Sequence, residues 1–182
     1  MAVLPAVAAL PAVAASAGWT TEPVPSPSSV TQLDGVACGA AGDCLAIGTS
    51  APLGSVALHL HGGRWTPVAL AKPAKRWELA AVSCASPSAC MAVGLISTAA
   101  KGHPDHPLAE RWDGRSWSLT SAPRVRGELD SVSCLAAHDC VAVGQRAGGS
   151  ASLIARWDGR KWSLAEPAAP AGGRPLAAVS CT

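Results

Sequence analysis

Two imidazoles flank a carboxylate in the run His103-Pro104-Asp105-His106, which gives the chain its best candidate for a metal site. Imidazole and carboxylate groups are ligands that divalent metal ions take from proteins. The same run is also typical of a polar surface loop that prolines keep rigid. We favour the loop and predict no metal or other cofactor, while His103, Asp105 and His106 stay as the candidate ligands.

Charged residues in two expected loops form a second group of candidates. They are Arg124, Arg126, Glu128 and Arg146. Together they would present a face for an anionic ligand or a sugar, although solvated loop charges are the commoner explanation. Asp113 and Asp158 follow tryptophans, but their place in turns indicates a structural role. The chain has no Ser-His-Asp order, phosphate-binding glycine loop or assignable pair of carboxylates, so we predict no catalytic residue.

Six of the seven cysteines form three pairs with C-x5-C spacing. The pairs are Cys38 with Cys44, Cys84 with Cys90, and Cys134 with Cys140. Each pair brackets a short loop between two expected strands, so its side chains can meet across the mouth of a hairpin. Zinc sites favour shorter gaps and need further ligands, which makes disulfides the better interpretation. Three disulfides indicate an oxidising compartment.

Composition sets the class of protein. The 182 residues carry 14 Lys and Arg against 12 Asp and Glu, and a net charge of +2, evenly spread, does not suit a nucleic-acid partner. A hydrophobic fraction of 49% argues against a disordered chain. Seven tryptophans with no phenylalanine or tyrosine indicate a core, of one domain or a little more, that depends on indole rings.

The first 17 residues form an apolar run that ends in Ala15-Ser16-Ala17, a small-x-small pattern that signal peptidase accepts. We predict a secretory signal peptide, although no Lys or Arg precedes the run; a short alanine-rich helix or an anchor is the alternative. The run is interrupted by two prolines and is at the short limit for a membrane span. We therefore expect a secreted protein with no membrane span in the mature chain.

The elements that must position these residues come from an internal repeat. The pattern Leu-x-x-Val-x-Cys begins at Leu33, Leu79, Leu129 and Leu176, at intervals of 46, 50 and 47 residues. Each complete unit holds four short runs separated by turn formers, without the unbroken 3.6-residue periodicity of helical arrays. Four strands per unit is typical of a β-propeller blade.

We therefore predict an all-β chain of about three four-stranded antiparallel blades with partial strands at both ends. The expected parts are a signal peptide at 1–17, a strand with a Pro/Ser linker at 18–32, blades at 33–78, 79–128 and 129–175, and the start of a truncated fourth blade at 176–182. Because propellers have four to eight blades, such a ring is incomplete. Self-association through open blade edges is one expected consequence.

The Trp-Asp-Gly-Arg sequence that begins at Trp112 predicts a two-residue turn with Asp-Gly at its centre. This turn places Trp112 opposite Arg115 and Glu110 opposite Trp117. The same sequence recurs at Trp157, so the same register is expected there. Both tryptophans of each hairpin then lie on one face, as a stripe of the core.

With these motifs the chain resembles secreted repeat proteins of actinobacteria, whose units run L-x-x-V-S-C, C-x-A-V-G and W-D-G-x-x-W. The resemblance extends over residues 19–182 and implies β-propeller blades, but it carries no established reaction. The Asp-box of sialidases is more distant, because its Asp-x-Gly-x-x-Trp core is one residue longer than the segment from Asp158 to Trp162. Kelch propellers carry a tyrosine that this chain lacks.

We interpret the chain as a secreted, non-enzymatic binding or scaffold module for an extracellular carbohydrate, cell-wall component or protein. The alternative is a fragment of an extracellular propeller hydrolase or lyase whose catalytic residues lie partly in missing blades. Acidic residues that converge at the axis of an intact ring would favour that alternative. A third interpretation is a truncated gene product with no function of its own.

Overall fold

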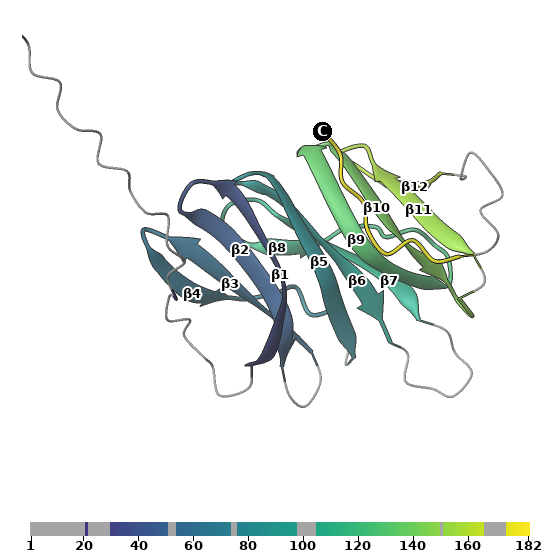
Figure 1. Cartoon of the computed structure of the whole chain (residues 1–182), viewed down its shortest axis with the longest axis horizontal. Coiled ribbons are helices and arrows are strands. Elements are labelled where there is room, and N and C mark those ends of the chain that lie inside the picture. Colours follow the sequence, from purple (N-terminus) through teal and green to yellow (C-terminus); the bar gives the residue numbers. More distant parts are fainter. Residues whose placement is uncertain are drawn as a thin grey trace, which may run out of the picture.

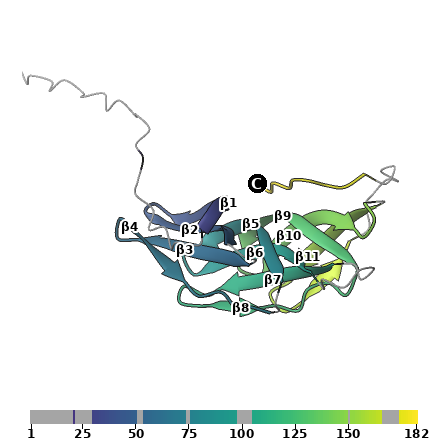
Figure 2. The same cartoon turned by 90° about the horizontal axis from the view of Figure 1, so that it is seen from below.

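The computed structural model describes residue 21 and residues 30–50, 54–73, 76–97, 105–149, 151–165 and 174–182. The expected signal peptide and His103 lie outside these residues. The described segments form three four-stranded antiparallel sheets, and none of them is a helix with the length and hydropathy that crossing a bilayer requires. Figures 1 and 2 show the sheets stacked in a row. The all-β fold class and the four-stranded blades are as predicted.

Strands follow one another in chain order within each sheet, so each blade is a simple meander. Blade 1 consists of β1 (Val30–Ala40), β2 (Asp43–Ser50), β3 (Ser55–His61) and β4 (Arg64–Val68). Blade 2 consists of β5 (Trp77–Ser86), β6 (Ala89–Ile96), β7 (His106–Trp112) and β8 (Trp117–Leu119). Blade 3 consists of β9 (Gly127–Ala136), β10 (Asp139–Arg146), β11 (Ser152–Trp157) and β12 (Trp162–Leu164).

Alternate residues of the strands pack into two cores between neighbouring blades. The core between blades 1 and 2 includes Leu45, Ile47, Ala57, Leu79, Trp112 and Trp117. The core between blades 2 and 3 includes Met91, Val93, Leu129, Val132, Trp157 and Trp162. Each core thus contains a pair of tryptophans from one hairpin, and these large rings fill the space that an alanine-rich chain would otherwise leave open.

The register of the tryptophan hairpins differs from the predicted one. Trp112 pairs directly with Trp117, so the loop has four residues instead of two. The carboxylate of Asp113 accepts hydrogen bonds from the backbone N–H groups of Ser116 and Arg115, at 2.8 and 2.9 Å. These bonds stabilise the longer loop and lower the pKa of Asp113 below its usual value. The expected core stripe is present, because both indole rings are buried with their centroids 5.6 Å apart.

A two-residue turn does occur in blade 1, where the tryptophan motif is degenerate. His61 pairs with Arg64, and the turn between them consists of Gly62 and Gly63. Both glycines have positive φ, 59° and 74°, as a type I′ turn requires. The β3–β4 hairpin is therefore tighter than its counterparts in the other blades, and β3 continues to His61.

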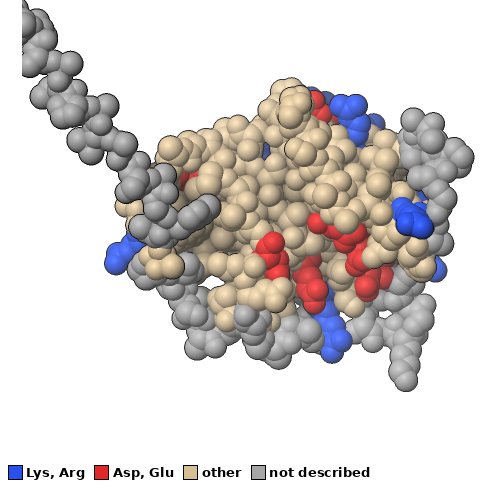
Figure 3. All heavy atoms as spheres, viewed as in Figure 1, with Lys and Arg blue, Asp and Glu red and all other residues tan. Residues whose placement is uncertain are grey.

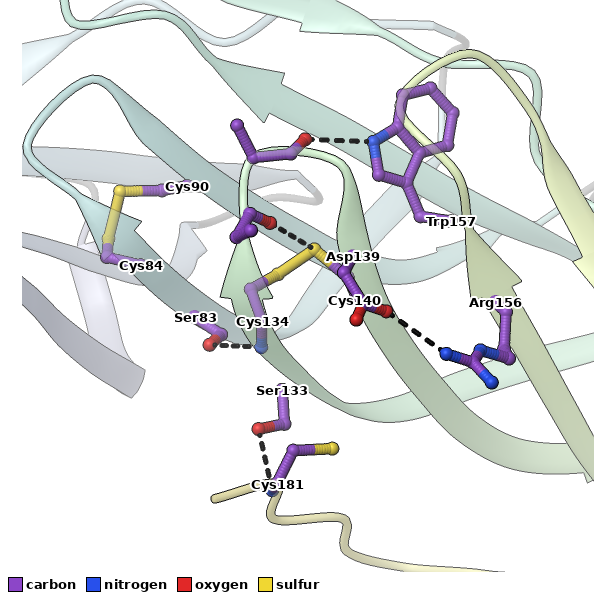
Figure 4. The surroundings of a disulfide bond; sticks show 12 residues. Ser83, Cys84, Cys90, Ser133, Cys134, Asp139, Cys140, Arg156, Trp157 and Cys181 are labelled. Carbon is purple, nitrogen blue, oxygen red and sulfur yellow. Dashed lines mark hydrogen bonds and ion pairs between the residues drawn. A yellow bond between two sulfur atoms is a disulfide. The ribbon is translucent and has the colours of Figure 1, made fainter.

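Three cysteine pairs lie at disulfide distance, as predicted. They are Cys38–Cys44, Cys84–Cys90 and Cys134–Cys140. The two members of each pair are register partners across the first two strands of a blade, and Figure 4 shows two of the bonds. Cys181 is the free cysteine of the seven. Such bonds fit an extracellular or otherwise oxidising environment.

Serines of the repeat motif connect one blade to the next (Figure 4). The hydroxyl of Ser83 in β5 accepts a hydrogen bond from the backbone N–H of Cys134 in β9 at 3.0 Å. The hydroxyl of Ser133 in β9 accepts the same bond from Cys181, also at 3.0 Å. Residues 174–182 therefore lie along β9 in the way that β9 lies along β5.

Candidate functional site

The residues on either side of the repeat leucine come together near one end of the first strands. The three sequences are Gln32-Leu33-Asp34, Glu78-Leu79-Ala80 and Glu128-Leu129-Asp130. Leu79 and Leu129 belong to the two cores and are fully buried. Because side chains alternate between the two faces of a strand, the residues that flank each leucine face away from the core.

A β-bulge and a glycine fix this arrangement in each blade. In blade 2 the register shifts between Leu79 and Ala81, so Ala80 has no partner across the strands. A Cβ atom at Gly94 would lie 1.9 Å from the carbonyl oxygen of Glu78. The matching glycines, Gly48 and Gly144, make the same close contact with the first strands of their own blades. The glycine four positions after the second cysteine of each blade thus lets the first strand, which carries the acidic residues, lie close to the backbone of the second strand.

A groove of about 440 Å³ crosses the first strands of the three blades at this level. Its charged lining residues are Asp34, Glu78, Glu128 and Asp130, and no Lys, Arg or His lines it within the described part of the chain. Figure 3 shows acidic side chains gathered on the face formed by β1, β5 and β9. The groove is therefore a site of concentrated negative charge on a protein whose net charge is +2.

Hydrogen bonds and burial distinguish the carboxylates of the groove. The side-chain amide of Gln145 donates to Glu128, and that of Gln32 donates to Asp34. Burial raises the pKa of Asp130, and repulsion from the charge of Glu128 raises it further. A cation placed between these two residues would relieve the repulsion, because it would favour the ionised form of both.

The predicted ligand-face residues are only partly brought together. Glu128 and Arg146 line a second hollow of about 220 Å³ beside the groove, together with Asp105 and the glycines of the loop after β10. Arg124 and Arg126 are exposed and do not line that hollow. Glu128 is therefore the predicted residue that also belongs to the acidic groove.

The predicted metal-binding run is seen in part. The backbone carbonyl of Asp105 accepts a hydrogen bond from Gly127 at 2.8 Å, and the ring Nδ1 of His106 lies 3.3 Å from the carbonyl oxygen of Val125. These contacts hold the connection between blades 2 and 3. A cluster with metal-ligand chemistry lies elsewhere in the described chain, in blade 1, and sequence reasoning missed it.

No protein-family model matches the chain, and no curated protein matches it significantly. Its structure is similar to that of YCF48 from Cyanidioschyzon merolae, a β-propeller protein, with a TM-score of 0.51 and 19% sequence identity. The fold is of the β-propeller type. The similarity covers 78% of this chain and 41% of the YCF48 chain, so the propeller blades here span less than half the length of that structure.

Blades of a propeller surround a central channel, and their first or last strands line it. β1, β5 and β9 contact their counterparts in the next blade, and they form the row that carries the groove (Figure 1). Asp34, Glu78 and Asp130 were missed as candidates because they are scattered along the sequence. The available signal was the recurrence of an acidic or amide residue next to the first three repeat leucines, Leu33, Leu79 and Leu129.

Proposed function

We propose that this protein is a secreted binding module of the propeller type whose acidic groove takes a cationic segment of an extracellular protein. The observation that carries the proposal is the convergence of four carboxylates from three blades on one open groove that no described Lys, Arg or His lines. A ligand with amino or guanidinium groups at regular intervals would meet one carboxylate-bearing strand after another. The three disulfides are the support for secretion.

A cationic cell-wall glycan is the other ligand of the predicted classes that this charge pattern would suit. A neutral carbohydrate usually stacks on an aromatic side chain, and no aromatic residue lines this groove within the described part of the chain. We favour a basic peptide, because its flexible lysine and arginine side chains can reach carboxylates that lie at different positions on the three strands. The experiment therefore compares a peptide with an amino-sugar oligomer.

Binding of a fluorescent oligolysine peptide, followed by anisotropy at low and at physiological salt, tests the proposal. Glu78→Gln removes an exposed carboxylate of the groove, and Asp139→Asn removes one outside it, so the two variants change the net charge equally. We expect Glu78→Gln to weaken binding several-fold, and Asp139→Asn to leave it within about twofold. Equal weakening by both variants, or no binding by the wild type, would refute the groove as the site.

An enzymatic role has one specific observation in its favour. Two carboxylates whose environments differ, such as Glu128 and Asp130 with its raised pKa, are what acid–base hydrolysis uses. Release of reducing sugars from extracellular polysaccharides, lost in Glu128→Gln and in Asp130→Asn, would support the hydrolase. Peptide binding that both variants weaken, without any turnover, supports the binding module.

Self-association belongs to the same proposal. Leu33 and Val36 of blade 1 are 45% and 64% exposed, whereas their counterparts in blade 2, Leu79 and Val82, are 1% and 9% exposed. Blade 1 packs over Leu79 and Val82 of blade 2. The face of β1 that carries Leu33 and Val36 could be covered by another blade in the same way. We infer that a second copy of this chain provides it. Light scattering should then give an oligomer mass that Leu33→Glu reduces toward the monomer, and a monomeric wild type would contradict this.

A further inference from the structure

One aspartate and two histidines of blade 1 meet at the end of the blade that is opposite to the groove. Asp43 is the first residue of β2, and His59 and His61 are in the last part of β3. The Asp43 carboxylate lies 3.1 Å from Nε2 of His59 and 3.0 Å from Nδ1 of His61. Potential ligand atoms of all three side chains lie within 4.8 Å of one another.

The strand register explains why the three side chains share a face. His59 pairs with Leu45, which lies two residues after Asp43 on the same face of β2. His61 lies two residues after His59 on β3, so alternation brings it to that face as well. The rings of Trp112 and His59 are in edge-to-face contact, with 5.3 Å between the ring centroids. The cluster is thus at the rim of the contact between blades 1 and 2.

Blades 2 and 3 have other residues at the position of His59, and in blade 3 the equivalent residue forms an ion pair. The register aligns His59 with Arg111 of blade 2 and Arg156 of blade 3, since each precedes the residue paired with the second disulfide cysteine. In blade 3, Arg156 forms an ion pair with Asp139 at 3.3 Å. Asp43 and Asp139 are likewise equivalent. Blade 1 therefore replaces a guanidinium, which has no lone pair to offer, with an imidazole, which can bind a metal ion.

The second histidine is available because blade 1 has the tighter turn. In blades 2 and 3 the residue equivalent to His61 is a loop aspartate, Asp113 or Asp158, whose carboxylate accepts bonds from backbone N–H groups of its loop. The Gly62-Gly63 turn removes the need for such a residue and extends β3 by one position. Two independent departures from the repeat thus place a histidine on each side of the same carboxylate.

The geometry points to a binding site for a divalent transition-metal ion, with zinc as the best match, formed by Asp43, His59 and His61. Two ligand atoms of a tetrahedral zinc ion, each about 2.1 Å from the metal, lie about 3.4 Å apart. The contacts of Asp43 with both rings are already close to that spacing. His61 is 76% exposed, so its ring can turn toward His59 without repacking the core. Three protein ligands leave a fourth position open to solvent or to a ligand group.

This site shares no residue with the acidic groove, so its test is independent of the proposed function. Calorimetric titration of the full chain with zinc chloride, in a Cys181→Ser background that removes the free thiol, measures stoichiometry and affinity. We expect one zinc ion per chain and a rise in Tm when zinc is present. His61→Ala should weaken binding more than about tenfold, because loss of an outer-shell partner alone has an effect of that size. Asp43→Asn is a second variant with the same expectation.

His138→Ala and Asp139→Asn are the matched controls. The first removes another exposed histidine, and the second removes the equivalent aspartate of blade 3. Both should bind zinc as the background protein does. The site is refuted if the protein binds no zinc, if His61→Ala binds it with unchanged affinity, or if the control variants lose as much affinity as His61→Ala.

Discussion

Ser83 of blade 2 accepts a hydrogen bond from the backbone N–H of Cys134 in blade 3, with 3.0 Å between Oγ and N. The same bond joins Ser133 to Cys181. The serine hydroxyl therefore accepts a hydrogen bond from a backbone N–H of the next repeat, and in blade 3 this N–H has no partner within the sheet of that blade. The role of the serine is to set the position of one blade relative to the next.

We expect Ser83→Ala to lower the free energy of unfolding by about 1–2 kcal/mol, because the N–H of Cys134 loses its acceptor in a partly buried contact. Urea unfolding measures this change. Ser180→Ala is the matched control, since Ser180 holds the same motif position in the last repeat and is exposed. Equal effects of the two substitutions would show that the blade-to-blade bond contributes nothing.

Gly94→Ala should be far more damaging than its size suggests. The new methyl group would lie 1.9 Å from the carbonyl oxygen of Glu78 and 2.8 Å from the Cα of Leu79, and both are backbone atoms of a paired strand. We expect a loss of about 3 kcal/mol or more and a distorted groove. In Gly35→Ala the nearest atom would be 3.5 Å away, which makes it the control. Similar Tm values for both variants would contradict the packing argument.

Glu110 gives the stability of the protein a specific pH dependence. Its side chain is fully buried, with one carboxylate oxygen bonded to the N–H of Ala71 and the other without a partner among the described residues. Burial raises its pKa above the usual 4.5, and the bond from Ala71 offsets only part of that rise. The folded state therefore holds the proton more tightly than the unfolded state does.

The contribution of Glu110 is thus fully present below its unfolded pKa and is lost as pH rises through the raised folded pKa. Denaturant unfolding of the wild type and of Glu110→Gln at a series of pH values measures this. We expect the free energy of unfolding of the wild type to fall, relative to the variant, as pH increases from about 4 toward neutrality. Parallel curves for the two proteins would rule out Glu110 as the source.

Thiol chemistry tests the disulfides. Of the seven cysteines, only Cys181 should react with a thiol reagent in the unfolded, non-reduced protein, and all seven should react after reduction. Each short loop contributes about 2 kcal/mol, so the reduced protein should unfold at a lower urea concentration. Six or seven reactive thiols before reduction, in protein from an oxidising compartment, would contradict the pairing.

Much of the fold was predictable because the same pattern of strand and turn residues recurs in three units. The recurring leucines, cysteine pairs and turn formers indicate four short strands per unit, and the paired cysteines indicate which strands meet. The hairpin register was predicted wrongly. Asp-Gly favours a two-residue turn, but the carboxylate of Asp113 can bond to two backbone N–H groups only across a longer loop, and that loop lets Trp112 lie against Trp117.

The sites were harder to find because they depend on contacts between strands. Asp43 and His59 are separated by 16 positions, and only the β2–β3 pairing brings them together. His61 lies in the repeat that departs most from the motif. Its presence there was interpreted as loss of the Trp-Asp-Gly-Arg sequence and not as a sign of a binding site. The groove carboxylates depend on bulges, such as the one at Ala80, that the sequence does not mark.

The acidic groove also has a consequence for how such a protein can change over time. Each of the three blades has its own bulge, its own glycine and its own pair of positions beside the leucine, so the wall of the groove is built from equivalent segments whose charges differ. Duplication or loss of one repeat in the gene would lengthen or shorten the charged track by one step. The number of repeats in the gene would therefore set the length of extended ligand that the groove can bind, while the contacts within each blade stay the same.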